Sequence, residues 1–219
     1  MAPIFPPRSN TFARLSILVV LILLAAITGF LVWWVHSSTF NKVGVNVPQP
    51  VPYPHSLHVV ALGISCRYCH DSVDKSAFAD FPPTETCMSC HSQVAVNNAD
   101  LAPVRDSWKT GKPIQWNYVN KLPDYVYFDH HIHVNKGVGC ETCHGRVDQM
   151  TTDVKANTFY MTWCLECHRD PAKFIRPVDK VYDMGYQPAE DQLTLGRRLV
   201  KEYNILPTVQ LLNCSTCHR

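Results

Sequence analysis

The ten cysteines of this chain constrain its fold more than any other feature, because all of them fall in one repeated frame. The chain has 219 residues and 10 cysteines. Every cysteine belongs to a Cys-x-x-Cys pair, and histidine follows each pair directly. Numbered along the chain as the first to the fifth frame, they are Cys66–His70, Cys87–His91, Cys140–His144, Cys164–His168 and Cys214–His218. An even cysteine count in a secreted chain first suggests disulfides, but disulfides do not need the recurring histidine.

Cys-x-x-Cys-His is the attachment signature of c-type haem. The two thiols form thioethers with the haem vinyl groups, and the histidine binds the iron as its proximal ligand. Structural zinc and redox-active Cys-x-x-Cys pairs also use paired cysteines, but they do not need this histidine in every frame. We therefore expect five c-type haems. The attachment residues are Cys66, Cys69, Cys87, Cys90, Cys140, Cys143, Cys164, Cys167, Cys214 and Cys217, and the proximal ligands are His70, His91, His144, His168 and His218.

Residues 16–35 are uncharged and strongly apolar, which is long enough for a transmembrane helix. Arg8 and Arg14 precede this segment without any acidic residue, so the positive-inside rule places residues 1–15 in the cytoplasm. A cleaved signal peptide is the competing interpretation. It would have a shorter apolar region and a cleavage site with small residues, whereas this segment ends near Trp33 and Trp34. We expect an uncleaved single-pass anchor in the inner membrane, with the haem domain in the periplasm.

A proline-rich segment follows the anchor. Pro48, Pro50, Pro52 and Pro54 alternate with other residues, a pattern typical of an extended and semi-rigid spacer. We expect residues 36–54 to form a periplasmic linker and residues 55–219 to form the haem domain.

The haem domain contains an internal repeat. In residues 53–91 an aromatic residue precedes a His-x-x-His motif and two frames, and residues 128–168 have the same order. Each repeat thus offers two frames and two spare histidines, which suits haem irons with two histidine ligands each. The expected distal ligands are His55, His58, His130 and His133. Histidines three apart lie on one side of a helical turn, so each motif can serve two irons.

The fifth, C-terminal haem has no obvious distal ligand. His131 is the remaining histidine of the motif region, and Met161 and Met150 are rivals. A methionine ligand would raise the reduction potential relative to histidine. His36, just past the anchor, is expected to be an interfacial side chain.

Five haems on residues 55–219 leave about 33 residues for each, too few for a large polypeptide core. We therefore expect a multihaem cytochrome c, mostly loops and short α-helices wrapped around five haems, with one N-terminal transmembrane helix. Two histidine ligands leave an iron no open position for substrate, so the pattern favours electron transfer over catalysis. The formal net charge of +2 is too small to indicate nucleic-acid binding.

Several long motifs resemble one family closely. They are PVPYPHSLHVVALGISCRYCH, SAFADFPPTETCMSCHSQ, DSWKTGKPIQW, LPDYVYFDHHIHVNKGVGCETCHGRVDQM and MTWCLECHRDP. Together with the anchor, they resemble the pentahaem cytochrome c subunit of alternative complex III, a bacterial quinol:electron-acceptor oxidoreductase. Two positions depart from the pattern: relatives often carry His at Asn120 and Ser at His131.

The resemblance implies a periplasmic, non-catalytic electron-transfer subunit beside an iron–sulfur subunit and polytopic quinol-binding membrane subunits. Electrons from quinol oxidation would leave towards a soluble cytochrome c, a blue-copper protein or an oxidase. An alternative is a free-standing membrane-anchored quinol dehydrogenase that feeds a periplasmic reductase. A catalytic multihaem reductase is a third alternative, for which only the fifth haem leaves room.

Overall fold

The computed structural model describes residue 6 and residues 8–218. Residues 1–5 and 7 of the expected cytoplasmic tail, and the last residue of the chain, lie outside the described residues. The chain divides into two compact units, residues 1–42 and 43–219. Each is described by itself.

The first unit is dominated by α1 (Ser9–His36), followed by the short α2 (Ser38–Asn41). Helix α1 is longer than the apolar segment 16–35, and its most apolar window has a mean hydropathy of 3.0. The hydroxyl of Thr28 donates to the carbonyl of Leu24 at 2.8 Å, so this polar group is satisfied within the helix, as a lipid environment demands. His36 Nδ1 lies 2.8 Å from the carbonyl oxygen of Val32, consistent with a side chain that belongs to the helix end.

The unit boundary falls at residue 42, earlier than the boundary at 54 that the proline pattern predicts. The reason is a set of contacts made by the spacer itself. The Gly44 amide donates to the Lys155 carbonyl at 2.9 Å. Gln49 and Asn117 exchange two hydrogen bonds of 2.8 and 3.0 Å, and Val51 is only 4% exposed. Residues 43–54 are therefore packed as part of the second unit.

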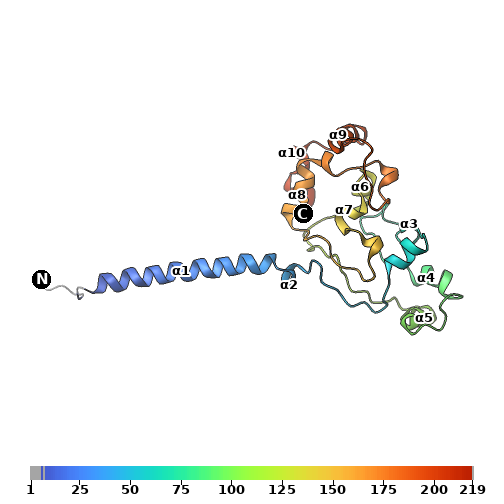
Figure 1. Cartoon of the computed structure of the whole chain (residues 1–219), viewed down its shortest axis with the longest axis horizontal. Coiled ribbons are helices and arrows are strands. Elements are labelled where there is room, and N and C mark those ends of the chain that lie inside the picture. Colours follow the sequence, from blue (N-terminus) through green and yellow to red (C-terminus); the bar gives the residue numbers. More distant parts are fainter. Residues whose placement is uncertain (1–5, 7, 219) are drawn as a thin grey trace. The chain divides into compact units, whose positions relative to one another are not determined.

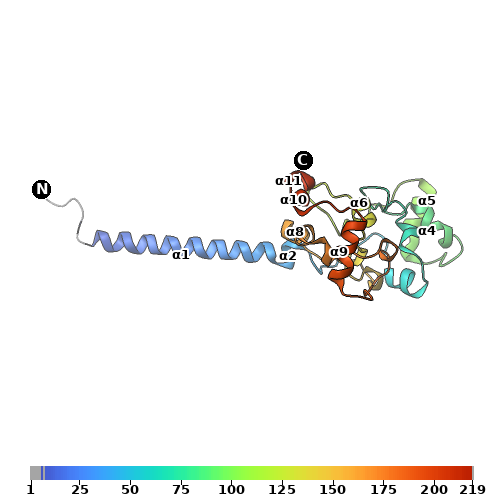
Figure 2. The ribbon, with the colours of Figure 1, turned by 90° about the horizontal axis from the view of Figure 1, so that it is seen from above.

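The second unit consists of short helices set in long loops (Figures 1 and 2). Residues 6 and 8–218 contain isolated β-bridges but no strand. The α-helices are α3 (Cys66–Cys69), α4 (Thr84–His91), α5 (Ala102–Thr110), α6 (His130–Asn135), α7 (Cys140–His144), α8 (Met161–Arg169), α9 (Gln192–Glu202), α10 (Thr208–Leu211) and α11 (Cys214–Cys217). A π-helical turn, η1 (Ser56–Ala61), and four 3₁₀ turns, η2 (Ala99–Leu101), η3 (Val147–Gln149), η4 (Pro171–Lys173) and η5 (Val178–Lys180), complete the list.

The second unit has few buried apolar side chains, in line with the small polypeptide core expected from the sequence. One buried cluster contains Val73, Val134 and Val181, and Cys140 packs against it. The other joins Ile175 to Leu195 and Leu199 on one face of α9. Three buried side chains in each cluster are few for a unit of this length.

Helix α9 is the most regular helix of this unit. Asp191 caps its start by accepting a hydrogen bond from the Thr194 amide at 2.9 Å, a common N-cap arrangement. The helix packs on η4, where its Gly196 lies against Ala172. It leads the chain towards the fifth frame.

Candidate haem sites

Each Cys-x-x-Cys-His frame forms its own short helix with the histidine at or just beyond its C-terminal end. The helices are α3, α4, α7, α8 and α11. Side-chain caps stabilise the start of two of them, α3 and α11: the Ser65 hydroxyl accepts from the Arg67 amide at 3.3 Å, and the Asn213 side-chain oxygen Oδ1 accepts from the Ser215 amide at 3.0 Å. A helical turn places both cysteines of a frame towards one side. This is the arrangement that two thioethers to one haem need.

The alternatives to haem attachment fit this arrangement less well. All ten cysteines have free thiols, so they do not form the disulfides considered above. Within residues 6 and 8–218, no three His, Cys, Asp or Glu side chains converge as they do around a bare zinc ion. Burial raises the pKa of Cys140 to about 11 and that of Cys143 to about 12. Redox-active Cys-x-x-Cys pairs have lowered thiol pKa values instead.

The proximal histidines are held through their Nδ1 atoms. Four of them lie close to a backbone carbonyl oxygen: His70 at 3.3 Å from Asp80, His91 at 3.1 Å from Val94, His168 at 3.0 Å from Leu211 and His218 at 3.2 Å from Tyr125. A metal-bound histidine typically donates its second ring N–H to a carbonyl or carboxylate oxygen. Because Nδ1 is engaged, Nε2 remains for an iron.

The proximal His144 has an amide partner instead. The Asn120 side-chain nitrogen lies 3.2 Å from His144 Nδ1. An asparagine amide can offer either its NH₂ group or its carbonyl oxygen, and the oxygen would accept a proton held on Nδ1. Asn120, one of the two departures from the family pattern, thus lies behind a proximal histidine. Burial, followed by the nearby His130 and His70, lowers the pKa of His144 to about 4, so this ring stays neutral as a ligand must.

The four expected distal histidines are held in the same way. His58 and His133 donate to the carbonyls of Pro54 and Asp129 at 3.0 and 2.7 Å. Each of these carbonyls belongs to the residue directly before the motif. His130 Nδ1 lies 2.9 Å from the Ala77 carbonyl oxygen. His55 Nδ1 lies 2.8 Å from a carboxylate oxygen of Asp153, although the approach is oblique and the nitrogen makes no well-aligned hydrogen bond.

Three pairs of histidine rings face each other at one characteristic distance. The ring centres are 6.3 Å apart in His58–His91, 6.4 Å in His130–His144 and 6.3 Å in His133–His168. A histidine nitrogen binds a metal at about 2.0–2.1 Å and the ring centre lies about 1 Å further out, so two rings across one iron have centres about 6 Å apart. The observed spacing therefore fits an iron between the members of each pair.

The first and fifth frames lack a histidine pair of this kind among the described contacts. The ring contact of His218 is with Tyr125, at 5.9 Å between centres. His131 directs Nδ1 to the Asp129 carboxylate at 2.6 Å and its side chain is 42% exposed. Met161 begins α8 and is 61% exposed. Neither expected ligand is brought to His218 by these contacts.

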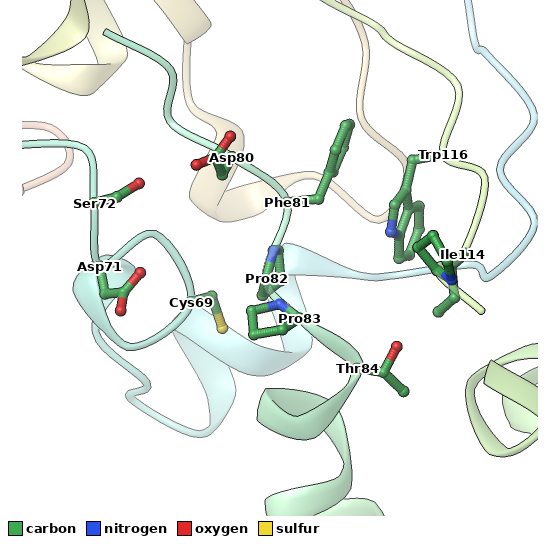
Figure 3. A pocket seen from close by; sticks show the side chains of 11 residues that line it. Cys69, Asp71, Ser72, Asp80, Phe81, Pro82, Pro83, Thr84, Ile114 and Trp116 are labelled. Atoms are coloured by element: carbon green, nitrogen blue, oxygen red, sulfur yellow. The ribbon is translucent and has the colours of Figure 1, made fainter. Parts of the chain in front are cut away.

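A cavity of about 430 Å³ lies beside the first frame (Figure 3). Its lining includes the Cys69 thiol, and Phe81 stacks on Trp116 with ring centres 5.7 Å apart. His70 is absent from the lining and turns Nδ1 towards the Asp80 carbonyl. The cavity therefore borders the attachment edge of this frame, where an apolar wall suits a haem rim.

The frames are ordered in space differently from the sequence. Thiols of neighbouring frames lie close enough to affect each other's pKa by repulsion between their charged forms. These neighbours are Cys87 and Cys69, Cys66 and Cys140, Cys143 and Cys164, and Cys164 and Cys217. The frames therefore follow one another as second, first, third, fourth and fifth. At the last step, α8 and α10 pack side by side (Figures 1 and 2), and α10 supplies the carbonyl that holds His168.

Two aromatic residues are functional neighbours that sequence reasoning did not single out. Tyr53 contacts both His55 and His58, with ring centres 4.9 and 4.3 Å apart. Phe128 contacts His130 and His133 in the same way, at 4.8 and 4.5 Å. The signal was present in the repeat, because each aromatic residue stands two positions before its motif.

Comparison with known proteins supports the haem-binding interpretation. Residues 126–219 match the family described as cytochrome c7 and related cytochrome c. A relative from Nitratidesulfovibrio vulgaris (strain Hildenborough), named as the multiheme cytochrome c subunit of menaquinone reductase, is 35% identical over 113 residues. That match covers 51% of this chain and 51% of the relative, so the chain spans about half the length of the curated relative it matches.

Proposed function

We propose that this chain is a multihaem c-type cytochrome that binds five c-type haems and conducts electrons between them without a substrate site of its own. The observation that carries the proposal is the way in which the histidine rings are held and paired. Nine of the histidines expected to bind iron have Nδ1 close to another polar atom, and three pairs have the spacing of axial ligands across an iron. When bound, each haem supplies a one-electron couple. The chain's own residues fix its position and its ligands.

We assign the axial ligands from the ring pairs and the repeat. His91 pairs with His58, His144 with His130, and His168 with His133, which gives three of the five expected proximal ligands a distal partner. His130 and His144 of the second repeat correspond to His55 and His70 of the first. We therefore assign His55 as the distal partner of His70. In support, both His55 and His70 lie near His144. The matched family and the relative support a c-type multihaem fold, whereas the number of five haems and these ligand pairs stay predictions.

For the fifth haem, His131 remains the preferred distal ligand and Met161 its rival. His131→Ala is then expected to convert one haem from low-spin to high-spin, while Met161→Leu leaves the spectrum unchanged. The two variants are compared by absorption and electron paramagnetic resonance (EPR) spectra of the oxidised protein. A spin change in Met161→Leu alone would transfer the assignment to the methionine.

Electrons follow the spatial order of the frames in this proposal, from the second through the first, third and fourth to the fifth, or in reverse. In support, Tyr68 of the first frame and Ser89 of the second share a hydrogen bond at 2.7 Å, and α8, which carries the fourth frame, packs on α10, which precedes the fifth. The second and fifth haems are then the terminal ones. An external donor and acceptor are expected to exchange electrons with these two.

We also propose that α1 remains uncleaved and anchors the chain in the inner membrane, with the N-terminus cytoplasmic and the haems periplasmic. Its length and hydropathy support a membrane-spanning segment, although a signal sequence has similar properties. The arginines before it support the orientation.

The proposed setting is a quinol-oxidising complex of the alternative complex III type. The chain would receive electrons from an iron–sulfur subunit beside polytopic quinol-binding subunits, and deliver them to a cytochrome c, a blue-copper protein or an oxidase. The named role of the relative in a menaquinone reductase supports a link to quinone chemistry. The alternative is a free-standing membrane-anchored quinol dehydrogenase that feeds a periplasmic reductase.

Gentle detergent extraction separates the two functions. The expected result is co-purification of the haem protein with an iron–sulfur subunit and polytopic subunits, and no quinol oxidation by the isolated chain. Quinol oxidation by a preparation that contains the haem protein alone would support the free-standing dehydrogenase instead.

A further inference from the structure

The two His-x-x-His motifs share a detailed local geometry that haem attachment alone does not require. Tyr53 stacks on His58 with an angle of 21° between rings and meets His55 edge-on at 83°. Phe128 stacks on His133 at 28° and meets His130 edge-on at 89°. The second histidine of the first motif, His58, lies in a π-helical turn, whereas the second motif lies on an α-helix. The same contacts thus recur on two different backbones.

The second histidine of each motif is held from two directions. One face lies on the aromatic ring, and Nδ1 is bound to the carbonyl of the residue that follows the aromatic residue, Pro54 or Asp129. Rotation of the imidazole about a bond from Nε2 to iron would break the stack. It would also swing Nδ1 away from the carbonyl. Aromatic pairs and hydrogen bonds are each worth about 1 kcal/mol, enough to favour one ring orientation.

We propose that Tyr53 and Phe128 are positioning residues, each of which fixes the planes of the two distal imidazoles in its repeat. This inference rests on the proposed ligand assignment. Partners of a metal-bound histidine set its orientation and so tune the metal. Here one side chain acts on the ligands of two irons at once.

The ring planes give this positioning a spectroscopic consequence. The two rings of a pair are inclined by 6° in His130–His144, 33° in His133–His168 and 66° in His58–His91. In a low-spin ferric haem, parallel imidazole planes separate the two iron dπ orbitals in energy, and crossed planes bring them together. The EPR signal therefore becomes more anisotropic from the first of these pairs to the last.

Phe128→Leu tests the proposal in the full-length, haem-loaded protein. The leucine keeps an apolar side chain but removes the aromatic ring that stacks on His133 and meets His130 edge-on. The expected result is a shift in the EPR g-values of two haems, those bound by His130 and His133, while the other signals and the haem content stay unchanged. Tyr53→Leu is expected to shift the signals of the haems bound by His55 and His58.

Phe128→Tyr is the matched control, because Tyr53 shows that the same geometry accommodates a tyrosine. It is expected to keep the wild-type g-values. No shift in Phe128→Leu, a shift confined to one haem, or a shift of all signals would overturn the proposal. His133→Ala separates the two levels of inference. If His133→Ala changes the spin state of one haem while Phe128→Leu changes nothing, the ligand assignment stands and the positioning role fails. If His133→Ala changes no spin state, both inferences fail.

Discussion

Replacing His133 by alanine is expected to convert one haem from a low-spin, six-coordinate state to a high-spin state. His133 is partly buried and its ring centre lies 6.3 Å from that of His168, with Nδ1 bound to the Asp129 carbonyl. Burial lowers its pKa, which keeps the ring neutral and available as a ligand. Alanine cannot reach the iron, and the space that the imidazole leaves admits water or a small ligand.

The change is measured in the oxidised protein by absorption and EPR spectroscopy, and in the reduced protein by the binding of carbon monoxide. Only one haem is expected to respond, because the other pairs keep both rings. His36→Ala is the control: this ring lies at the end of α1 beside the Val32 carbonyl and is not expected to bind iron. An unchanged spectrum for His133→Ala would falsify the ligand assignment in the second repeat.

The helical geometry of the frames was predictable because it is local. The cysteines and the histidine of a frame stand within five consecutive positions, and a helical turn is sufficient to arrange them. The distal ligand assignment stays a prediction, and it rests on a different feature of the sequence. The repeat shows that His130 and His133 occur where His55 and His58 do, and spare histidines near haem frames have few other roles.

The partners of these histidines could not be predicted, because the chain path brings them from far away. Ala77 lies in a loop of the first repeat and holds His130 of the second, while α10 holds His168 through Leu211. Nothing in the local pattern of either histidine indicates a carbonyl so distant in sequence. The spatial order of the frames could not be predicted from the sequence for the same reason.

The proline-rich spacer packs within the second unit, which its local sequence pattern does not predict. Alternating prolines predict an extended segment. The pattern does not tell whether such a segment is free or packed. Here Gln49 and Asn117 satisfy each other's polar groups, and Val51 is buried, so residues 43–54 belong to the second unit.

Replacing Gly196 by alanine is expected to destabilise the second unit although alanine is the better helix former. A Cβ at this position of α9 would lie 1.9 Å from the carbonyl oxygen and 2.7 Å from the Cα of Ala172. Both atoms belong to the backbone of η4, so the clash cannot be relieved by a side-chain rotation. The same carbonyl accepts a hydrogen bond from Gln192 at 2.9 Å, which any displacement of η4 would strain.

The opposing contributions can be compared. Alanine gains about 1 kcal/mol over glycine within a helix, whereas overpacking of a tight contact costs about 1–3 kcal/mol and a lost hydrogen bond about 1 kcal/mol more. The net loss is about 1–3 kcal/mol, which corresponds to a decrease in Tm of about 2–12 °C for a unit of this size. Thermal unfolding of the haem-loaded protein, followed by circular dichroism, measures it.

The neighbouring Arg197→Ala supplies the control, because Arg197 is exposed on the same helix and its loss is expected to change stability by less than about 0.5 kcal/mol. If Gly196→Ala unfolds at the wild-type temperature or above it, α9 does not depend on close approach to η4. The buried contacts of Leu195 and Leu199 with Ile175 would then tolerate a wider spacing. A lower Tm in Gly196→Ala alone would show that backbone contact between α9 and η4 stabilises this part of the chain, where few buried side chains are available to do so.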